Sequence, residues 1–287
     1  MPFPSDIDVV DTMLQVPGGD DRAWYDFMQP LFMDERSRNY AKMPAEHLFG
    51  KNIPELKPGD DPVAFTVGEL DRFRISRALV GVQSAAGQEA VRRYPGRFVP
   101  TWHANPNRGM DEVRAIVAAK ETWGIKAVTA FPSGLCPQVP IDDARWYPIY
   151  AKCVELDLAF ACTVGVPGPR IPMAPQTVDR IDAVCWFFPE LRFVMRHGAM
   201  PQTELAIALM LKYENLYYST SAMAPRHYPK SIIDYANTRG ANKLIYAGYW
   251  PMGLSLDRIF SELRELPLRD HVWPRFLRDN AVEVFRL

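Results

Sequence analysis

Short apolar runs alternate with amphipathic runs along most of this chain. A first apolar, β-branched run covers residues 6–14 and is typical of a strand. Seven later runs have the same character: 76–82, 97–102, 125–130, 158–164, 191–196, 216–221 and 243–247. Helical periodicity is found in the segments that follow them: 83–94, 110–123, 142–155, 175–187, 202–212 and 228–238, with two closing helices at 255–266 and 272–278. The pattern therefore predicts eight strands in regular alternation with helices.

Regular alternation of this kind predicts an α/β fold with a parallel sheet. Eight such units in 287 residues favour a closed (β/α)8 TIM barrel that forms a single domain over residues 1–287. The competing fold is an open, doubly wound sheet. That fold calls for a glycine-rich phosphate loop after the first strand, and we find none in the sequence.

The connection after the first strand is unusually long. It runs over residues 15–60, and only its 24–38 part has helical character, because prolines and glycines interrupt the rest. Helical periodicity resumes at residues 62–73. A connection of this length is uncommon inside a compact domain. We therefore expect an insertion that covers one end of the barrel or contributes to a dimer surface.

The composition narrows the possible partners. The net charge is −1, so no overall field points to nucleic acid or to an anionic membrane. The chain shows neither a secretory signal nor an apolar stretch near the ~20 residues of a membrane span. Its four cysteines form no CxxC pair and lie mostly in apolar segments. These features predict a cytoplasmic protein with reduced thiols and a small-molecule partner.

The chemistry of a barrel of this type lies at the C-terminal ends of its strands. His197 and Gly198 directly follow the run 191–196. Histidine titrates near neutral pH, and glycine permits a sharp turn beside it. The alternative is a histidine whose ring is satisfied by hydrogen bonds within the core. Arg196 precedes His197 and should point the opposite way on a strand, which argues against a carboxylate clamp at this position.

Other strand ends and the loops that follow them supply polar and aromatic groups. Arg170 lies in a Pro/Gly-rich loop, where it could grip an anionic substrate or remain a solvated charge. The complete set of candidate substrate-binding residues is Gln15, Met13, Thr163, Arg170, His103, Ser219 and Trp250.

The order of the strand-end motifs resembles the amidohydrolase superfamily, in the amidohydrolase-related branch that includes aminocarboxymuconate-semialdehyde decarboxylase and the hydroxybenzoate decarboxylases. In that branch strand one ends in Asp-x-His-x-His, strand five in His, strand six in His-Gly-Gly and strand eight in Gly-(Ser/Thr)-Asp-(Tyr/Trp)-Pro, and the chain closes with Asn-Ala-x-x-x-Phe. The corresponding segments here are Asp11-Thr-Met-Leu-Gln15, Thr163-Val-Gly165, Arg196-His-Gly-Ala199, Ala247-Gly-Tyr-Trp-Pro251 and Asn280-Ala-Val-Glu-Val-Phe285.

The metal-ligand positions of that family carry other residues in this chain. The strand-one histidines fall on Met13 and Gln15, the strand-five histidine on Thr163, and the strand-eight aspartate on Tyr249. These four side chains would make a poor site for Zn²⁺ or Mn²⁺. The resemblance therefore implies a barrel without the family's metal, and we expect no cofactor. His197 is retained, and its counterpart in the decarboxylases transfers protons.

We expect a metal-independent hydrolase or decarboxylase-like lyase that acts on a small aromatic or enol-rich carboxylic acid. His197 would be the acid/base, with Asp11 and Tyr249 as further catalytic residues. Asp11 would orient His197 or, alternatively, bind backbone amides. Tyr249 would donate a hydrogen bond or fill the former metal cavity as an aromatic plug.

Two other hypotheses remain open on the sequence alone. One is a non-catalytic barrel that uses the old pocket to bind a ligand. The other is a metal-dependent hydrolase with relocated ligands, for instance His103, His197 and Asp11. Family members often dimerise, so the resemblance also implies a homodimer.

Overall fold

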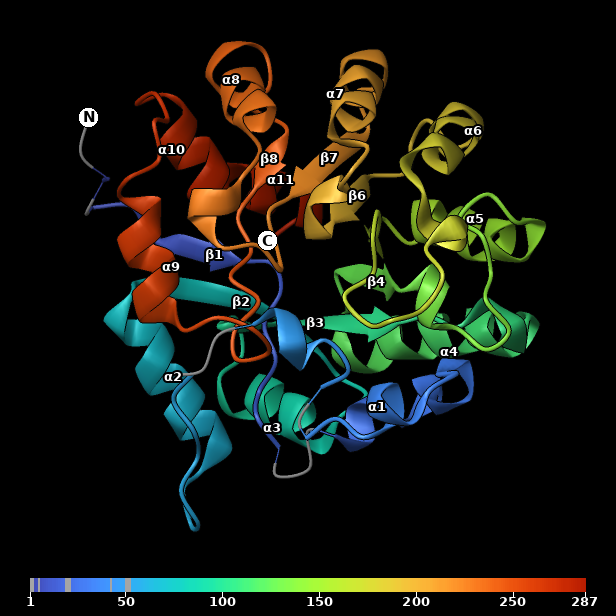
Figure 1. The fold of residues 1–287 in the computed structure, drawn as a ribbon, viewed down its shortest axis with the longest axis horizontal. Coiled ribbons are helices and arrows are strands. Elements are labelled where there is room, and N and C mark those ends of the chain that lie inside the picture. Colours follow the sequence, from blue (N-terminus) through green and yellow to red (C-terminus); the bar gives the residue numbers. More distant parts are fainter. Residues whose placement is uncertain (1–2, 5, 19–21, 42, 50–52) are drawn as a thin grey trace.

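Eight parallel strands form one sheet in which each strand pairs with its neighbours in chain order (Figure 1). The computed structural model describes residues 3–4, 6–18, 22–41, 43–49 and 53–287. The strands are β1 (Val9–Asp11), β2 (Ile75–Gly81), β3 (Phe98–His103), β4 (Ala127–Ala130), β5 (Ala159–Thr163), β6 (Phe193–Arg196), β7 (Leu216–Ser219) and β8 (Leu244–Ile245).

The sheet closes on itself between its first and last strands. The Thr12 amide donates to the Tyr246 carbonyl at 3.3 Å, and the Gln15 amide donates to the Trp250 carbonyl at 3.2 Å. Leu14 and Trp250 also form a parallel bridge. The predicted (β/α)8 barrel is therefore confirmed.

Most helices surround this barrel and cover the outer face of its strands (Figure 1). The helices are α1 (Glu35–Arg38), α2 (Pro62–Arg72), α3 (Ala85–Arg93), α4 (Met110–Trp123), α5 (Tyr147–Glu155), α6 (Ile181–Phe187), α7 (Thr203–Lys212), α8 (Lys230–Thr238), α9 (Leu256–Leu263), α10 (Val272–Pro274) and α11 (Asn280–Phe285). Of these, α1 belongs to the segment after β1, and α11 packs against the N-terminal end of the barrel. Among the described residues, no helix is both long enough and apolar enough to cross a membrane.

The helix ends agree with the sequence in part. Gly124 ends α4 in the left-handed conformation, with φ at 65°, as its position predicts. Gly109 takes the N-terminal capping position of α4, and Asp111 lies inside its first turn. The helix expected from residue 142 begins as a short 3-10 turn, whose cap is the side chain of Asp143.

The barrel interior is filled from its N-terminal end. Apolar side chains of the strands, such as Val10, Val99 and Val194, pack there against Val284 and Phe285 of α11. We call the opening at the C-terminal ends of the strands the mouth of the barrel. Because side chains alternate along a strand, the next inward positions beyond the apolar layer line this mouth. The fold therefore seals one end of the barrel with apolar groups and leaves the polar groups at the other.

The long segment after β1 lies over the C-terminal end of the barrel. It contains a 3-10 helix at Ala23–Leu31, then α1, then a 3-10 helix at Glu46–Leu48. The Phe27 ring lies 6.3 Å from the ring of His103, and the Phe49 ring lies 5.6 Å from that of Tyr249. Two aromatic rings of this segment thus stand above the mouth of the barrel.

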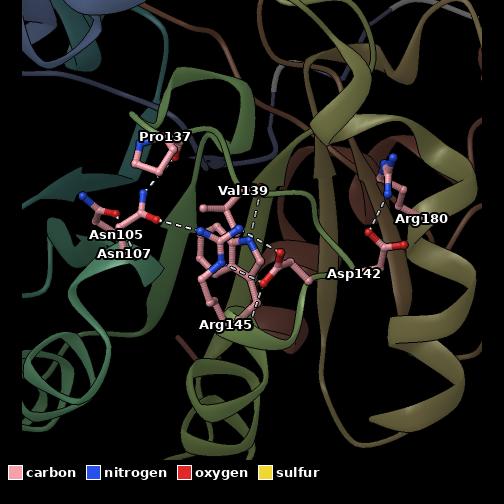
Figure 2. Close-up of polar contacts among 9 residues, drawn as sticks. Asn105, Asn107, Pro137, Val139, Asp142, Arg145 and Arg180 are labelled. Carbon is pink, nitrogen blue, oxygen red and sulfur yellow. Dashed lines mark hydrogen bonds and ion pairs between the residues drawn. The ribbon is translucent and has the colours of Figure 1, made fainter.

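Polar contacts join the loops that form one side of the rim (Figure 2). The Asn107 side chain, after β3, donates to the Pro137 carbonyl at 2.8 Å and accepts from Arg145 at 3.1 Å. Arg180 forms an ion pair with Asp142 at 2.7 Å. These contacts hold the loops after β3, β4 and β5 in fixed positions relative to one another.

Candidate active site

His197 stands at the point where β6 ends and the chain turns. Its φ is +67°, and Gly198 and Ala199 also have positive φ. The His197 amide donates to the Ser221 hydroxyl at 3.1 Å, and that hydroxyl lies 3.1 Å from the ring Nδ1. Because the hydroxyl accepts the amide proton, its own proton is free for Nδ1. With the hydroxyl as donor to Nδ1, the ring proton is on Nε2.

Arg196 faces the inside of the barrel, together with His197. Val194 packs in the interior, so Arg196, two residues further along β6, also points inward. The prediction that Arg196 and His197 face opposite ways is therefore wrong. Alternation holds only for extended residues, and the positive φ of His197 turns its side chain back toward the mouth.

The guanidinium of Arg196 is buried without a counterion. The residue is 9% exposed, and its Nε has no hydrogen-bond partner. No ion pair forms at this residue within the described part of the chain. Burial lowers the pKa of Arg196 to about 10, so the group stays positively charged at neutral pH. The mouth thus contains a fixed positive charge.

Two histidines share this mouth and are neutral there. Burial lowers the pKa of His197 to about 3, and the positive charge of Arg196 adds to the effect. The same two causes lower the pKa of His103 to about 4. The Nδ1 of His103 lies 3.2 Å from the Thr129 hydroxyl. The expectation that His197 titrates near neutral pH is therefore wrong for the free protein.

Tyr249 lies against His197. The two rings meet edge to face, with their centroids 5.1 Å apart. Burial raises the pKa of Tyr249 to about 12, so its side chain is a neutral phenol at pH 7. It occupies the position of the family's strand-eight aspartate as a hydrogen-bond donor and not as an anionic ligand.

The neighbouring strands place hydroxyl groups beside Arg196. Thr163 of β5 is its partner in the strand register, so the two side chains lie on the same inward face. Ser219, at the end of β7, has a buried hydroxyl without a partner. Ser221 is the residue that the sequence-based site missed. Its shared strand face with Ser219 was the available signal, because both belong to the run that ends at residue 221.

Gln15 and Arg170 belong to a separate space above the mouth. Both line a cavity of about 870 Å³ between the barrel and the segment after β1. Arg36, His47 and Phe49 also line it, and Phe49 connects it to Tyr249. The Gln15 side-chain nitrogen is buried without a partner. This cavity, which we call the vestibule, therefore has a largely apolar lining with two arginines and two glutamates, Glu46 and Glu55.

Asp11 does not orient His197, and the alternative, that it binds backbone amides, is confirmed. Val10 packs in the barrel interior, so Asp11 faces the helices. Its Oδ1 accepts the amides of Met13 and Gly248, both at 3.0 Å. A Cβ at Gly248 would come within 2.6 Å of Oδ2, so only glycine fits there. Asp11 joins the ends of β1 and β8 and thereby positions Met13, whose own side chain is half-buried.

Trp250 is not placed to bind a substrate. Its side chain is fully buried, and its ring lies 6.1 Å from that of Phe65 in α2. The backbone of Trp250 bonds to β1 through Leu14 and Gln15. The residue therefore packs between the barrel and its outer helices, as a core side chain.

The residues at the family's metal positions do not fit a metal ion. A thioether, an amide, a hydroxyl and a phenol replace the expected donors, and the phenol of Tyr249 is neutral. Within the described ranges, no three His, Cys, Asp or Glu side chains are grouped to hold a metal. The hypothesis of relocated ligands at His103, His197 and Asp11 is contradicted because Asp11 faces outward.

The buried Asp11 carboxyl gives the stability a distinct pH dependence. Burial raises its pKa to about 7, so the folded state holds a proton that the unfolded state releases near pH 4. Stability from this group is complete below pH 4 and is lost as the pH rises to 7. Relative to Asp11→Asn, we expect the wild type to lose about 2 kcal/mol of unfolding free energy between pH 5 and 8.

Urea unfolding at both pH values measures this difference. The exposed Asp257→Asn variant is the control for the change of carboxylate to amide. Parallel pH profiles for the wild type and Asp11→Asn would contradict the prediction. All other titratable groups are the same in both proteins, so their effects cancel in the comparison.

Comparisons with known proteins agree with this barrel. The family model described as amidohydrolase matches residues 53–287. A TIM-barrel protein of Bordetella bronchiseptica superposes with a TM-score of 0.73 at 20% identity and covers 98% of this chain and 99% of that one. No curated protein matches the sequence significantly.

Two further solved structures have the same fold and are enzymes by name. The 5-carboxyvanillate decarboxylase of Sphingomonas paucimobilis has a TM-score of 0.67 at 14% identity, covering 98% of this chain and 100% of that one. A probable 2-pyrone-4,6-dicarboxylic acid hydrolase of Acinetobacter baumannii, with citric acid bound, has a TM-score of 0.62 at 14% identity, with the same coverage. The resemblance of the strand-end motifs is thereby confirmed: this chain belongs to the amidohydrolase family.

Proposed function

We propose that this protein is a metal-independent hydrolase or carbon–carbon lyase that acts on a small aromatic or enol-rich carboxylic acid. Structurally similar proteins are named as a decarboxylase and as a probable hydrolase of such acids. The observation that carries the proposal is the environment of His197. Its ring is held by Ser221 and lies against Tyr249, while the family's metal positions hold residues that do not fit a metal.

In the lyase reaction, the bond between the substrate and its carboxyl carbon breaks. In an enol-rich β-keto acid the electron pair moves into the carbonyl group as CO₂ leaves, and the enolate carbon is then protonated. In a 2-hydroxybenzoic acid the ring carbon that bears the carboxyl group is protonated first, and loss of CO₂ restores the aromatic ring. In both cases His197 gives the proton as an imidazolium, which forms when the bound substrate anion offsets the charge of Arg196, and solvent then protonates the ring again. A substrate with its own electron sink supplies the stabilisation that a metal gives elsewhere.

In the hydrolytic reaction, His197 accepts the proton of the attacking water. The water oxygen bonds to the substrate carbonyl, and the leaving oxygen takes up the proton. Tyr249 can donate a hydrogen bond to the developing oxyanion in either reaction. Ser221 positions the imidazole by fixing which ring nitrogen carries the proton.

The vestibule fits the approach of an acidic substrate. Arg36 and Arg170 line it and can attract a carboxylate, although Glu46 and Glu55 also belong to the lining. The volume of about 870 Å³ is within the range of small-molecule sites.

Metal analysis tests the proposal directly. We expect protein purified without chelators to contain far less than one equivalent of zinc or manganese per chain. Turnover of a panel of 2-hydroxybenzoic acids and aromatic lactones, followed by product chromatography, should survive dialysis against a chelator. One equivalent of bound metal, together with activity that the chelator abolishes and the metal restores, would overturn the proposal.

A binding protein without catalysis is the second candidate. The observation that favours it is the aromatic cover, because Phe27 and Phe49 stand over His103 and Tyr249. This candidate predicts that acids from the panel bind to the protein and are recovered unchanged.

A further inference from the structure

We infer that Arg196 is the binding site for the carboxylate of an aromatic acid, and that its guanidinium supplies the positive charge that the barrel's substituted metal positions lack. The inference deepens the proposed function, because it names the group by which the substrate is held. The inference can be tested by measuring ligand binding, without any measurement of turnover.

The first support is the absence of a partner for Arg196. A buried charge without a counterion costs several kcal/mol, so buried arginines normally pair with carboxylates. Arg192, four residues earlier in the same run, shows the normal arrangement. Its guanidinium forms an ion pair with Asp157 and also donates to the Val284 carbonyl at 2.7 Å. Arg196 has neither contact, although it is more deeply buried than Arg192.

The second support is the set of groups around the guanidinium. The charge of Arg196 acts on the pKa of His103, His197 and Tyr249, so all three lie close to it. These groups are neutral, and no Asp or Glu of the described residues contributes to the pKa of Arg196. A carboxylate that entered would therefore meet one cation and no repelling anion.

The third support is that hydrogen-bond donors are present for the lone pairs of a bound carboxylate. An ionised carboxylate only accepts hydrogen bonds, and it needs several of them when buried. The guanidinium provides a planar fork. The unpartnered hydroxyl of Ser219 and the hydroxyl of Thr163, which is next to Arg196 in the strand register, lie on the two flanking strands. Tyr249 adds a phenolic donor.

Aromatic side chains of the mouth are partly exposed. Thr129, Phe131, His103, His197 and Tyr249 are each half-buried, so solvent reaches this layer of the barrel. Aromatic faces suit a flat ring better than a flexible aliphatic chain. The ligand class is therefore a monoanionic aromatic acid whose carboxylate points down to Arg196 and whose ring lies against Tyr249.

Binding of the anion would also prepare His197 for proton transfer. Arg196, Ser221 and Tyr249 are the charged or polar groups that face this imidazole. A carboxylate on Arg196 offsets the positive charge that now disfavours the imidazolium. The substrate would thereby raise the pKa of its own proton donor.

Calorimetric titration with benzoate and with its neutral analogue benzamide, at pH 7 and low salt, tests the inference. We expect the wild type to bind benzoate at least tenfold more tightly than benzamide. In Arg196→Met, benzoate affinity should fall at least tenfold while benzamide affinity stays the same. Arg196→Lys should keep part of the benzoate affinity, because the charge remains and the fork is lost.

Arg192→Met is the matched control, because it removes a guanidinium from the opposite end of the barrel. It should bind benzoate like the wild type. A second readout is thermal: benzoate should raise the Tm of the wild type and leave that of Arg196→Met unchanged. The inference is overturned if wild-type protein does not bind benzoate, binds benzamide equally well, or keeps its benzoate affinity in Arg196→Met. If benzoate binds through Arg196 but no acid or lactone is converted, the proposed function is contradicted and the inference about Arg196 still holds.

Discussion

Replacing His197 by asparagine is expected to lower kcat by two to four orders of magnitude on any acid or lactone that the wild type converts. A positioned acid/base contributes about 10²–10⁴-fold, and asparagine cannot carry the proton. Asparagine is the right replacement because it tolerates the left-handed backbone that His197 adopts, with φ at +67°. The backbone amide bond to Ser221 is also retained, so the turn after β6 should fold normally.

The measurement separates proton transfer from a structural role. KM should change much less than kcat, because carboxylate binding is assigned to Arg196. Added imidazole should restore part of the turnover in His197→Asn if the missing group is an acid/base. His227→Asn is the control, because His227 is exposed in the short 3-10 helix Pro225–His227. Unchanged kcat in His197→Asn would remove this residue from the mechanism.

The order of strands and the position of the mouth could be predicted from the sequence. Both depend on local periodicity and on the rule that places barrel chemistry at the C-terminal strand ends. His197, Thr163 and Tyr249 were found in this way, and the structure places all three at this end of the barrel. The motif order along the chain was enough to identify the family before any contact was known.

The direction of individual side chains could not be predicted. Arg196 was expected to face away from His197, because alternation was assumed to continue through residue 197. The positive φ of His197, stabilised by Ser221 in the turn after β7, depends on tertiary contacts. Asp11 and Trp250 were assigned to the mouth by their positions at strand ends, yet each faces the outer helices. A one-residue difference in where a strand stops reverses the face.

The pKa of His197 could not be predicted from the sequence either. A histidine in the mouth was expected to titrate near neutrality, but burial and the neighbouring guanidinium hold His197 neutral. Both causes depend on the direction of Arg196. One side-chain orientation therefore decides both the electrostatics of the mouth and the ligand that suits it.

The second large effect is on stability and has an unusual sign. Arg196→Met should raise the free energy of unfolding of the ligand-free protein by about 1–3 kcal/mol, because it replaces an unpaired buried charge with an apolar chain of similar length. For a domain of this size, that gain corresponds to several degrees in Tm. Thermal unfolding followed by circular dichroism, without any carboxylic acid in the buffer, measures it.

Arg192→Met should move stability in the other direction. It removes a guanidinium that pairs with Asp157 and donates to the Val284 carbonyl, so we expect a loss of about 1 kcal/mol. The two variants delete the same group from the same run of sequence, at opposite ends of one strand. A loss of stability in Arg196→Met as large as that in Arg192→Met would mean that Arg196 supports the fold.

The opposite signs of the two stability changes bear on function, because burying an unpaired cation does not stabilise a folded chain. Hydrophobic contacts around the stem of Arg196 would be kept by methionine, so packing does not explain the guanidinium. A group that destabilises the free protein and stabilises a complex is typical of a binding site, where stability is sacrificed for affinity. If Arg196→Met is both more stable and unable to bind benzoate, the positive charge in this barrel belongs to its ligand and not to its fold.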